Sequence, residues 1–317
     1  MVYSSNDAGT VLAEHISGTV ENFAVLMNQK AIDIGCTNTN FTNPSGVHDE
    51  NHYSTAYDLA LISNYAMNNQ TFRKLVSTTS YALPATNKYE LSDRYFTNSN
   101  ELIIVNNNKR EDNYYYKYAT GIKTGFTTPA GYCLIASANK DGFELLTVVL
   151  GATQTTSGLS QRYIDTISLF DYGYKTYAMK KIISEGDIVQ TVDIDNATNS
   201  TKKLDIIVSK DIKALVKSEN MDSQLLPQIT LYDNLKAPIV QYQEVGTISY
   251  VSEGITYEAT IIANSEVKAS HTFIKICIFI LILLLAYIYL RNKNLKKKTR
   301  KKNYRISKNK KKNYRKK

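Results

Sequence analysis

The triplet Lys123-Thr124-Gly125 contains the residues whose types and spacing point most directly to chemistry. Strand-forming residues follow it, and we expect the triplet itself to lie on the edge strand of a sheet. There the lysine would supply positive charge, the threonine a hydroxyl donor, and the glycine close access for an extended chain. Such a strand can hold a carboxylate-bearing peptide against a serine nucleophile. By itself the triplet is also typical of a surface turn with a solvated lysine.

A second element, Ser4-Ser5-Asn6, leads directly into a helical pattern. Acyl-enzymes that recognise penicillin carry Ser-x-x-Lys, Ser-x-Asn and Lys-Thr-Gly in this chain order. The second and third elements are present here, in order. Four stretches resemble the low-molecular-mass penicillin-binding proteins of the penicillin-binding protein 5 type, which are serine-type D-alanyl-D-alanine carboxypeptidases. These stretches are residues 4–8, 51–60, 120–125 and 130–138.

The Ser-x-x-Lys element is missing from the place where this family has it, several tens of residues before Ser-x-Asn. Only three residues precede Ser4. The segment Ser77 to Ser80 has no lysine, and Ser137 with Lys140 lies on a predicted hairpin after Lys-Thr-Gly. We therefore expect an N-terminally truncated chain, with Met1 an internal methionine read as a start. For the same reason we expect the chain as given to lack its secretion signal.

The resemblance implies acyl transfer through a serine ester. The missing serine would attack the peptide bond between two terminal D-alanines, and the missing lysine would take its proton. Ser4 would relay a proton, since a hydroxyl both donates and accepts, and Asn6 would orient that lysine or the substrate amide. Lys123 and Thr124 would bind the terminal carboxylate, and Arg162 would add a bidentate clamp.

Structural interpretations stand beside these roles. Ser4 and Asn6 are also suited to capping a helix, and Arg162 to the exposed face of one. His52 and Asp58 match family positions too, and we interpret them as structural. The histidine would anchor a loop, and the aspartate would be an acid in the first turn of a helix.

Charge and hydropathy separate the end of the chain from the rest. Sixteen of the 38 Lys and Arg residues lie within 291–317, without an acid, so 1–290 has 22 basic against 29 acidic side chains. Residues 273–290 contain one charge, and at ~1.5 Å per residue they span roughly 27 Å, close to the hydrocarbon core of a bilayer. This pattern predicts a membrane-spanning helix. The basic residues predict a cytoplasmic tail; nucleic-acid binding is the less favoured interpretation, because orientation and anionic lipid already account for the charges.

Periodicity indicates which elements position the motifs. Helical stripes are predicted over 8–16, 20–34, 55–67 and 162–177, and two strands over 132–138 and 143–150 are joined by an Asp-Gly turn. Short strands follow at 187–194, 203–208, 228–232, 240–250 and 255–262. The fold class is α/β: a partial serine transpeptidase/β-lactamase-like domain of helices plus antiparallel sheet, then a small all-β domain and one transmembrane helix.

We therefore predict five segments. They are a partial catalytic domain (1–178), a β-rich domain (179–263), a linker (264–272), a transmembrane helix (273–290) and a basic cytoplasmic tail (291–317). Cys36 and Cys133 are isolated and favour buried thiols, although a bond between them stays open. The four histidines form no ligand cluster, and we expect neither a metal nor another cofactor.

The predicted function is removal of the terminal D-alanine from peptidoglycan stem peptides outside the cell membrane. The predicted partners are stem peptides that end in D-Ala-D-Ala, the membrane, and β-lactam inhibitors if the nucleophile is restored; nucleic acid is not expected. A β-lactamase would share the motifs but would lack the β-rich domain and the membrane helix. A non-catalytic, membrane-tethered cell-wall-binding protein is the more serious alternative, because no nucleophile is found. We expect the chain itself to be inactive.

Overall fold

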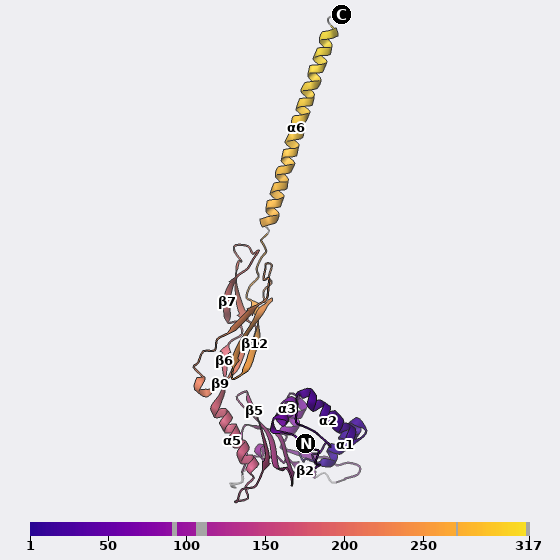
Figure 1. Cartoon of the computed structure of the whole chain (residues 1–317), viewed down its shortest axis with the longest axis vertical. Coiled ribbons are helices and arrows are strands. Elements are labelled where there is room, and N and C mark those ends of the chain that lie inside the picture. Colours follow the sequence, from indigo (N-terminus) through magenta and orange to yellow (C-terminus); the bar gives the residue numbers. More distant parts are fainter. Residues whose placement is uncertain (91–93, 106–112, 271, 315–317) are drawn as a thin grey trace. The chain divides into compact units, whose positions relative to one another are not determined.

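The structure, a computed structural model, describes residues 1–90, 94–105, 113–270 and 272–314. It divides into two compact units (Figure 1). The first contains Met1–Met179 and Leu215–Ser223, and the second Lys180–Ala214 and Gln224–Lys317. The predicted fold class is confirmed: helices and an antiparallel sheet, then a β-rich unit and one apolar C-terminal helix. Residue 271 of the expected linker and residues 315–317 of the expected tail lie outside the described part.

The first unit is built around an antiparallel sheet in the order β3-β4-β5. Its strands are β3 (Ala119–Thr127), β4 (Gly131–Lys140) and β5 (Phe143–Ala152). The predicted Asp-Gly turn joins β4 to β5, with positive φ at Asp141 and Gly142, as a two-residue hairpin of this type requires. The Asn139 side-chain oxygen accepts a hydrogen bond from the Gly142 amide at 3.0 Å. In the order β3-β4-β5, β3 lies at one edge of the sheet.

Helices pack on both faces of the sheet (Figure 1). The helices of this unit are α1 (Asn6–Ser17), α2 (Val20–Ile34), α3 (Ala56–Met67), α4 (Gln70–Ser77) and α5 (Gln161–Thr176), of which α3, α4 and α5 contact the sheet. A side chain caps the N-terminus of each of the first four helices: in order, these caps are Ser5, Thr19, Thr55 and Asn69. On one face Tyr163 and Phe170 of α5 pack with Leu134 and Ala136. The α3–α4 corner packs on the same sheet through a separate cluster that includes Ile135 and Leu146.

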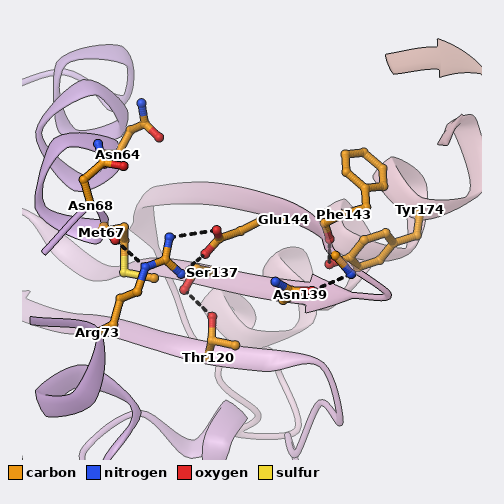
Figure 2. A network of polar contacts seen from close by, with 11 residues as sticks. Asn64, Met67, Asn68, Arg73, Thr120, Ser137, Asn139, Phe143, Glu144 and Tyr174 are labelled. Carbon is orange, nitrogen blue, oxygen red and sulfur yellow. Dashed lines mark hydrogen bonds and ion pairs between the residues drawn. The ribbon is translucent and has the colours of Figure 1, made fainter. Parts of the chain in front are cut away.

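The α3–α4 corner is also fixed to the sheet by polar contacts (Figure 2). The Arg73 guanidinium donates to both carboxylate oxygens of Glu144 on β5, at 2.7 and 2.8 Å. Its Nε also donates to the carbonyl of Met67 at the end of α3. Between β3 and β4, the hydroxyls of Thr120 and Ser137 are 2.7 Å apart. The bidentate, charge-assisted pair of Arg73 and Glu144 fixes the orientation of the corner as well as its distance from β5.

Two further strands of the first unit are β1 (Ser80–Leu83) and β2 (Arg94–Thr97), an antiparallel pair before the short 3-10 helix η1 (Glu101–Ile103). The sequence predicted none of these elements, nor α4. α4 has only eight residues, too few for a clear helical period.

The second unit contains a five-stranded sheet in the order β10-β11-β12-β8-β7. The bounds are β7 (Ile188–Asp193), β8 (Lys203–Val208), β10 (Gln228–Leu231), β11 (Glu244–Ser252) and β12 (Ile255–Ala263). The sequence also missed the pair of β6 (Tyr177–Ile183) with β9 (Ile212–Lys217), whose residues are divided between the two units, and the 3-10 helix η2 (Ser218–Asn220) of the first unit. The segment expected as a linker instead continues this unit: Val267 is buried and pairs with Ile239.

The C-terminal helix α6 (Thr272–Tyr314) contains the predicted membrane span. By length and composition, residues 276–298 are able to cross a membrane, and none of that window is buried in the structure. The basic segment after it, expected as a tail, continues the same helix as far as Tyr314.

Close packing of β3 against α4 depends on Gly121. Its φ is +149°, and a Cβ there would lie 2.7 Å from Cγ2 of Val76, which is buried. We expect Gly121→Ala to destabilise the first unit by about 1–3 kcal/mol, because the clash is with an immobile core side chain. Hydrogen exchange followed by mass spectrometry should show faster exchange in β3 and β4, with the second unit unchanged.

The matched control is Gly9→Ala, where the nearest atom to the new Cβ is the Pro44 carbonyl oxygen at 3.9 Å. Gly9 lies inside α1, so alanine should preserve or slightly increase protection. Equal exchange in the two variants would contradict the packing argument.

Candidate active site

Two sequence elements far apart in the chain meet at Lys123. The Lys123 ammonium, half-buried on β3, donates to the Ser4 hydroxyl at 2.5 Å and to the Thr124 carbonyl oxygen at 2.7 Å. The structure thus brings the Ser-x-Asn element and the Lys-Thr-Gly element together. Gly125, the last residue of the triplet, is exposed on the same edge strand. A Cβ at Gly125 would be in ordinary contact with Cys133, 3.8 Å away.

Ser4 is held in an unusual backbone conformation immediately before α1. Its φ is +60°, a region that serine rarely adopts and that is enriched at functional sites. Ser5, not Ser4, caps the helix by accepting from the Ala8 amide at 3.3 Å. Asn6 is the first residue of α1 and its side chain is exposed. The structure therefore does not place Ser4 as the helix cap.

The hydroxyl of Thr124 meets a residue that the sequence did not single out. Its Oγ1 is 2.7 Å from Oγ of Ser99, which follows β2. No motif identifies this serine, because its position beside Thr124 depends on the path of the chain between β2 and β3. The only signal in the sequence is that it stands between two asparagines, Asn98 and Asn100, both of which are buried.

Arg162 lies in the first turn of α5 and contacts the backbone of the two strands at the site. Its Nη1 donates to the carbonyls of Gly125 at 3.3 Å and Cys133 at 3.5 Å. The guanidinium also lies over the rings of Tyr132 and Tyr163, at 5.2 and 4.8 Å from their centroids. Arg162 thus braces the end of the triplet, and its role as a carboxylate clamp stays a prediction.

The site is positively charged. Burial, and then repulsion from Arg162, lower the pKa of Lys123. Within the described ranges the ion pairs are Lys30–Asp33, Arg73–Glu144, Lys181–Asp211 and Lys268–Glu266. Neither Lys123 nor Arg162 takes part in them. A half-buried ammonium without an acidic partner, beside hydroxyl donors, is suited to binding an anionic group.

Asp58 and His52 occupy the positions that we interpreted as structural. Asp58 is buried in the first turn of α3 and accepts from the Asn38 amide at 2.8 Å and the Thr39 hydroxyl at 2.7 Å. These hydrogen bonds lower the pKa of Asp58. The His52 Nδ1 is 3.1 Å from the Thr42 amide, and burial lowers the pKa of His52. Both residues fix the loop between α2 and α3.

The two cysteines outside the C-terminal helix are free thiols. Cys36 is buried, and its thiol is 3.6 Å from the carbonyl oxygen of Asp58. Burial raises the pKa of the Cys36 thiol. Cys133 is half-buried on β4, beside the triplet.

Comparison with known proteins gives a consistent assignment for both units. The family model for D-alanyl-D-alanine carboxypeptidase matches residues 1–154. The model for the C-terminal domain of penicillin-binding protein 5 matches residues 177–269.

Individual relatives agree with the family models. D-alanyl-D-alanine carboxypeptidase DacF of Bacillus subtilis is 30% identical over 279 residues, which cover 86% of this chain and 66% of DacF. DacA of Haemophilus influenzae is 30% identical over 257 residues, 80% of this chain and 59% of DacA. The crystal structure of penicillin-binding protein 5 from Haemophilus influenzae matches with a TM-score of 0.57 at 28% identity, covering 84% of this chain and 72% of that one.

The chain spans less than two thirds of the length of both curated relatives. Over that span, sequence and structure lead to one assignment. The chain belongs to the family of serine-type D-alanyl-D-alanine carboxypeptidases and has the C-terminal domain of penicillin-binding protein 5.

Proposed function

We propose that this protein is a D-alanyl-D-alanine carboxypeptidase, and that these 317 residues contain its site for the terminal carboxylate of the stem peptide. The observation that carries the proposal is the Lys123 ammonium, hydrogen-bonded to Ser4, adjacent to Thr124 and without an acidic partner among the described residues. The substrate carboxylate would supply the missing negative charge. Gly125 leaves the edge strand open for the backbone of an extended peptide.

The remaining roles follow from where the groups lie. Ser4 contacts Lys123, so its hydroxyl is able to pass a proton towards a departing D-alanine while the ammonium polarises it. Asn6 would orient the substrate amide from the start of α1. Arg162 holds the carbonyl of Gly125 and would add a second positive charge behind the carboxylate.

Acylation also requires a serine that a neighbouring base activates. Ser-x-x-Lys spacing occurs at four serines, Ser137, Ser200, Ser265 and Ser307. Ser137 is fully buried and its hydroxyl contacts Thr120, while the other three belong to the second unit. We infer that the 317 residues recognise the peptide but do not acylate. β-Lactams, which mimic the same peptide, would inhibit covalently only where the nucleophile is present.

The second candidate is a non-catalytic, membrane-tethered protein that binds the cell wall. It is favoured by one observation: no Ser-x-x-Lys pair lies beside Lys123 among the residues that the structure describes. The DNA immediately upstream distinguishes the two functions. An in-frame signal peptide followed by Ser-x-x-Lys supports the carboxypeptidase, and an in-frame stop codon without them supports the binding protein.

We further propose that the helix around 273–290 crosses the cell membrane once. The first unit and the β-rich part of the second, which precede residue 273, would then lie outside, where the peptidoglycan is. The basic segment 291–317 would lie in the cytoplasm. Sixteen Lys and Arg residues in that segment support this orientation, at about 1 kcal/mol for each one close to an anionic leaflet.

Replacing Lys123 by alanine should abolish most carboxylate recognition. We expect the full chain in detergent to bind N-acetyl-D-Ala-D-Ala more tightly than its C-terminal amide, in titrations followed by saturation-transfer NMR. Lys123→Ala should weaken binding of the acid about tenfold to a hundredfold, because a charge-assisted contact is lost. Lys140→Ala is the matched control: its ammonium lies over the Tyr118 ring at 5.5 Å, and its loss should leave both affinities unchanged. Equal affinities in the Lys123 and Lys140 variants would refute the carboxylate site.

Topology is testable without the nucleophile. If a secretion signal is supplied, protease added to cells stripped of their wall should digest the residues before 273 and spare a tag at the C terminus. Replacing the basic residues of 291–317 by glutamine should weaken this preference, because those charges set the orientation. A digested C-terminal tag with protection of the residues before 273 would contradict the proposal, since peptidoglycan lies only on the outer face.

A further inference from the structure

The contact between Ser99 and Thr124 joins two hydroxyls with no carboxylate or ammonium between them. Their oxygens are 2.7 Å apart, which is a typical distance for such a bond. Each hydroxyl has one proton to donate, so only one of the two donates in this contact. If Thr124 donates to Ser99, its proton is used and its lone pairs are left for a ligand. If Ser99 donates, the proton of Thr124 stays available.

A carboxylate accepts hydrogen bonds and has none to donate. It therefore selects the arrangement in which Ser99 donates to Thr124 and Thr124 donates to the ligand. Two hydrogen bonds in series polarise one another, and the negative charge at the end strengthens both. Resting on the proposed function, we propose that Ser99 is a positioning residue of the carboxylate site, which directs the Thr124 proton to the C-terminal carboxylate of the peptide.

The chain around Ser99 is fixed by buried hydrogen bonds. The Asn98 side chain donates to the carbonyl of Thr78 at 2.9 Å and accepts from the Asn100 amide at 2.9 Å. The Asn100 side chain in turn accepts from the Leu102 amide at 3.2 Å. Because both asparagines are buried, these bonds are shielded from competing water, and the segment has little freedom to move Ser99 away from β3.

A third support links Ser99 to the other cation of the site. The Tyr163 hydroxyl donates to the carbonyl of Ser99 at 3.0 Å and lies 3.4 Å from Nη2 of Arg162. Tyr163 is fully buried and its ring stacks on Tyr114, at 4.6 Å between centroids. Ser99 is thus supported through its own backbone, and its hydroxyl is left to contact Thr124.

The role predicts selectivity and not only affinity. Without the Ser99 hydroxyl, the Thr124 side chain remains, but no hydrogen bond from Ser99 directs the Thr124 proton towards the carboxylate. Binding of the acid N-acetyl-D-Ala-D-Ala by the full chain should weaken about three- to tenfold in Ser99→Ala. The affinity for the C-terminal amide should change by less than about twofold, because the amide has no negative charge to strengthen the two linked hydrogen bonds. Ser99→Thr retains a hydroxyl and should keep most of the selectivity.

The experiment measures the affinity of both ligands for the full chain in detergent by saturation-transfer NMR. The matched control is Ser200→Ala, which removes the serine from another serine–threonine hydroxyl pair, 3.2 Å from Thr198 in the second unit. Ser99→Ala is also made in a Thr124→Val background, where it should have no further effect on the acid. That non-additivity is expected only if Ser99 acts through Thr124.

Each outcome decides the proposal. If Ser99→Ala weakens the acid and the amide equally, or weakens binding in the Thr124→Val background as well, its role is structural and the proposal is wrong. If Ser99→Ala behaves like Ser200→Ala while the unchanged chain still prefers the acid, the proposal fails and the proposed function stands. If the unchanged chain shows no preference for the acid, both are overturned.

Discussion

The hydrogen bond between the Lys123 ammonium and the Ser4 hydroxyl is the contact on which the rest of the site depends. It joins the start of α1 to the edge of the sheet across 118 intervening residues. Burial of an ammonium without an acidic partner is unfavourable, as the lowered pKa of Lys123 shows. The structure therefore retains a positive charge that the described residues do not neutralise, and in the proposed function a substrate carboxylate does so.

The supports around this contact explain why it is maintained. Ser5 caps α1 and so leaves Ser4 just outside the helix, with its side chain free for Lys123. Arg162, in the first turn of α5, donates hydrogen bonds to backbone carbonyls of β3 and β4. The Arg73–Glu144 pair fixes the α3–α4 corner to the same sheet (Figure 2). The proposed recognition of a carboxylate thus depends on a scaffold that these residues form.

Local chemistry made much of the fold predictable. Thr55 and Asn139 are examples, because a helix cap and a hairpin turn depend on residues close in sequence. The family resemblance supplied Ser4 and Lys123, but not their contact. Ser99 could not be found, because its partner Thr124 is 25 residues away and no pattern relates them. Strand β6 was missed for a different reason: it follows α5 without an intervening turn residue. The helical pattern of apolar residues in α5 therefore runs directly into the alternating pattern of the strand, and no signal marks the boundary.

Recognition without acylation is the central claim, and a fluorescent penicillin tests both halves in one measurement. Binding of its carboxylate by the full chain should raise the fluorescence anisotropy of the dye above the value measured with the Lys123→Ala variant. Adding N-acetyl-D-Ala-D-Ala, which competes for the site, should reverse this rise. Denaturation of the same sample should return the anisotropy to that of the free dye, because no ester has formed. A signal that survives denaturation would show a nucleophile in these 317 residues. The absence of any rise above the Lys123 variant would show that the site does not bind the carboxylate.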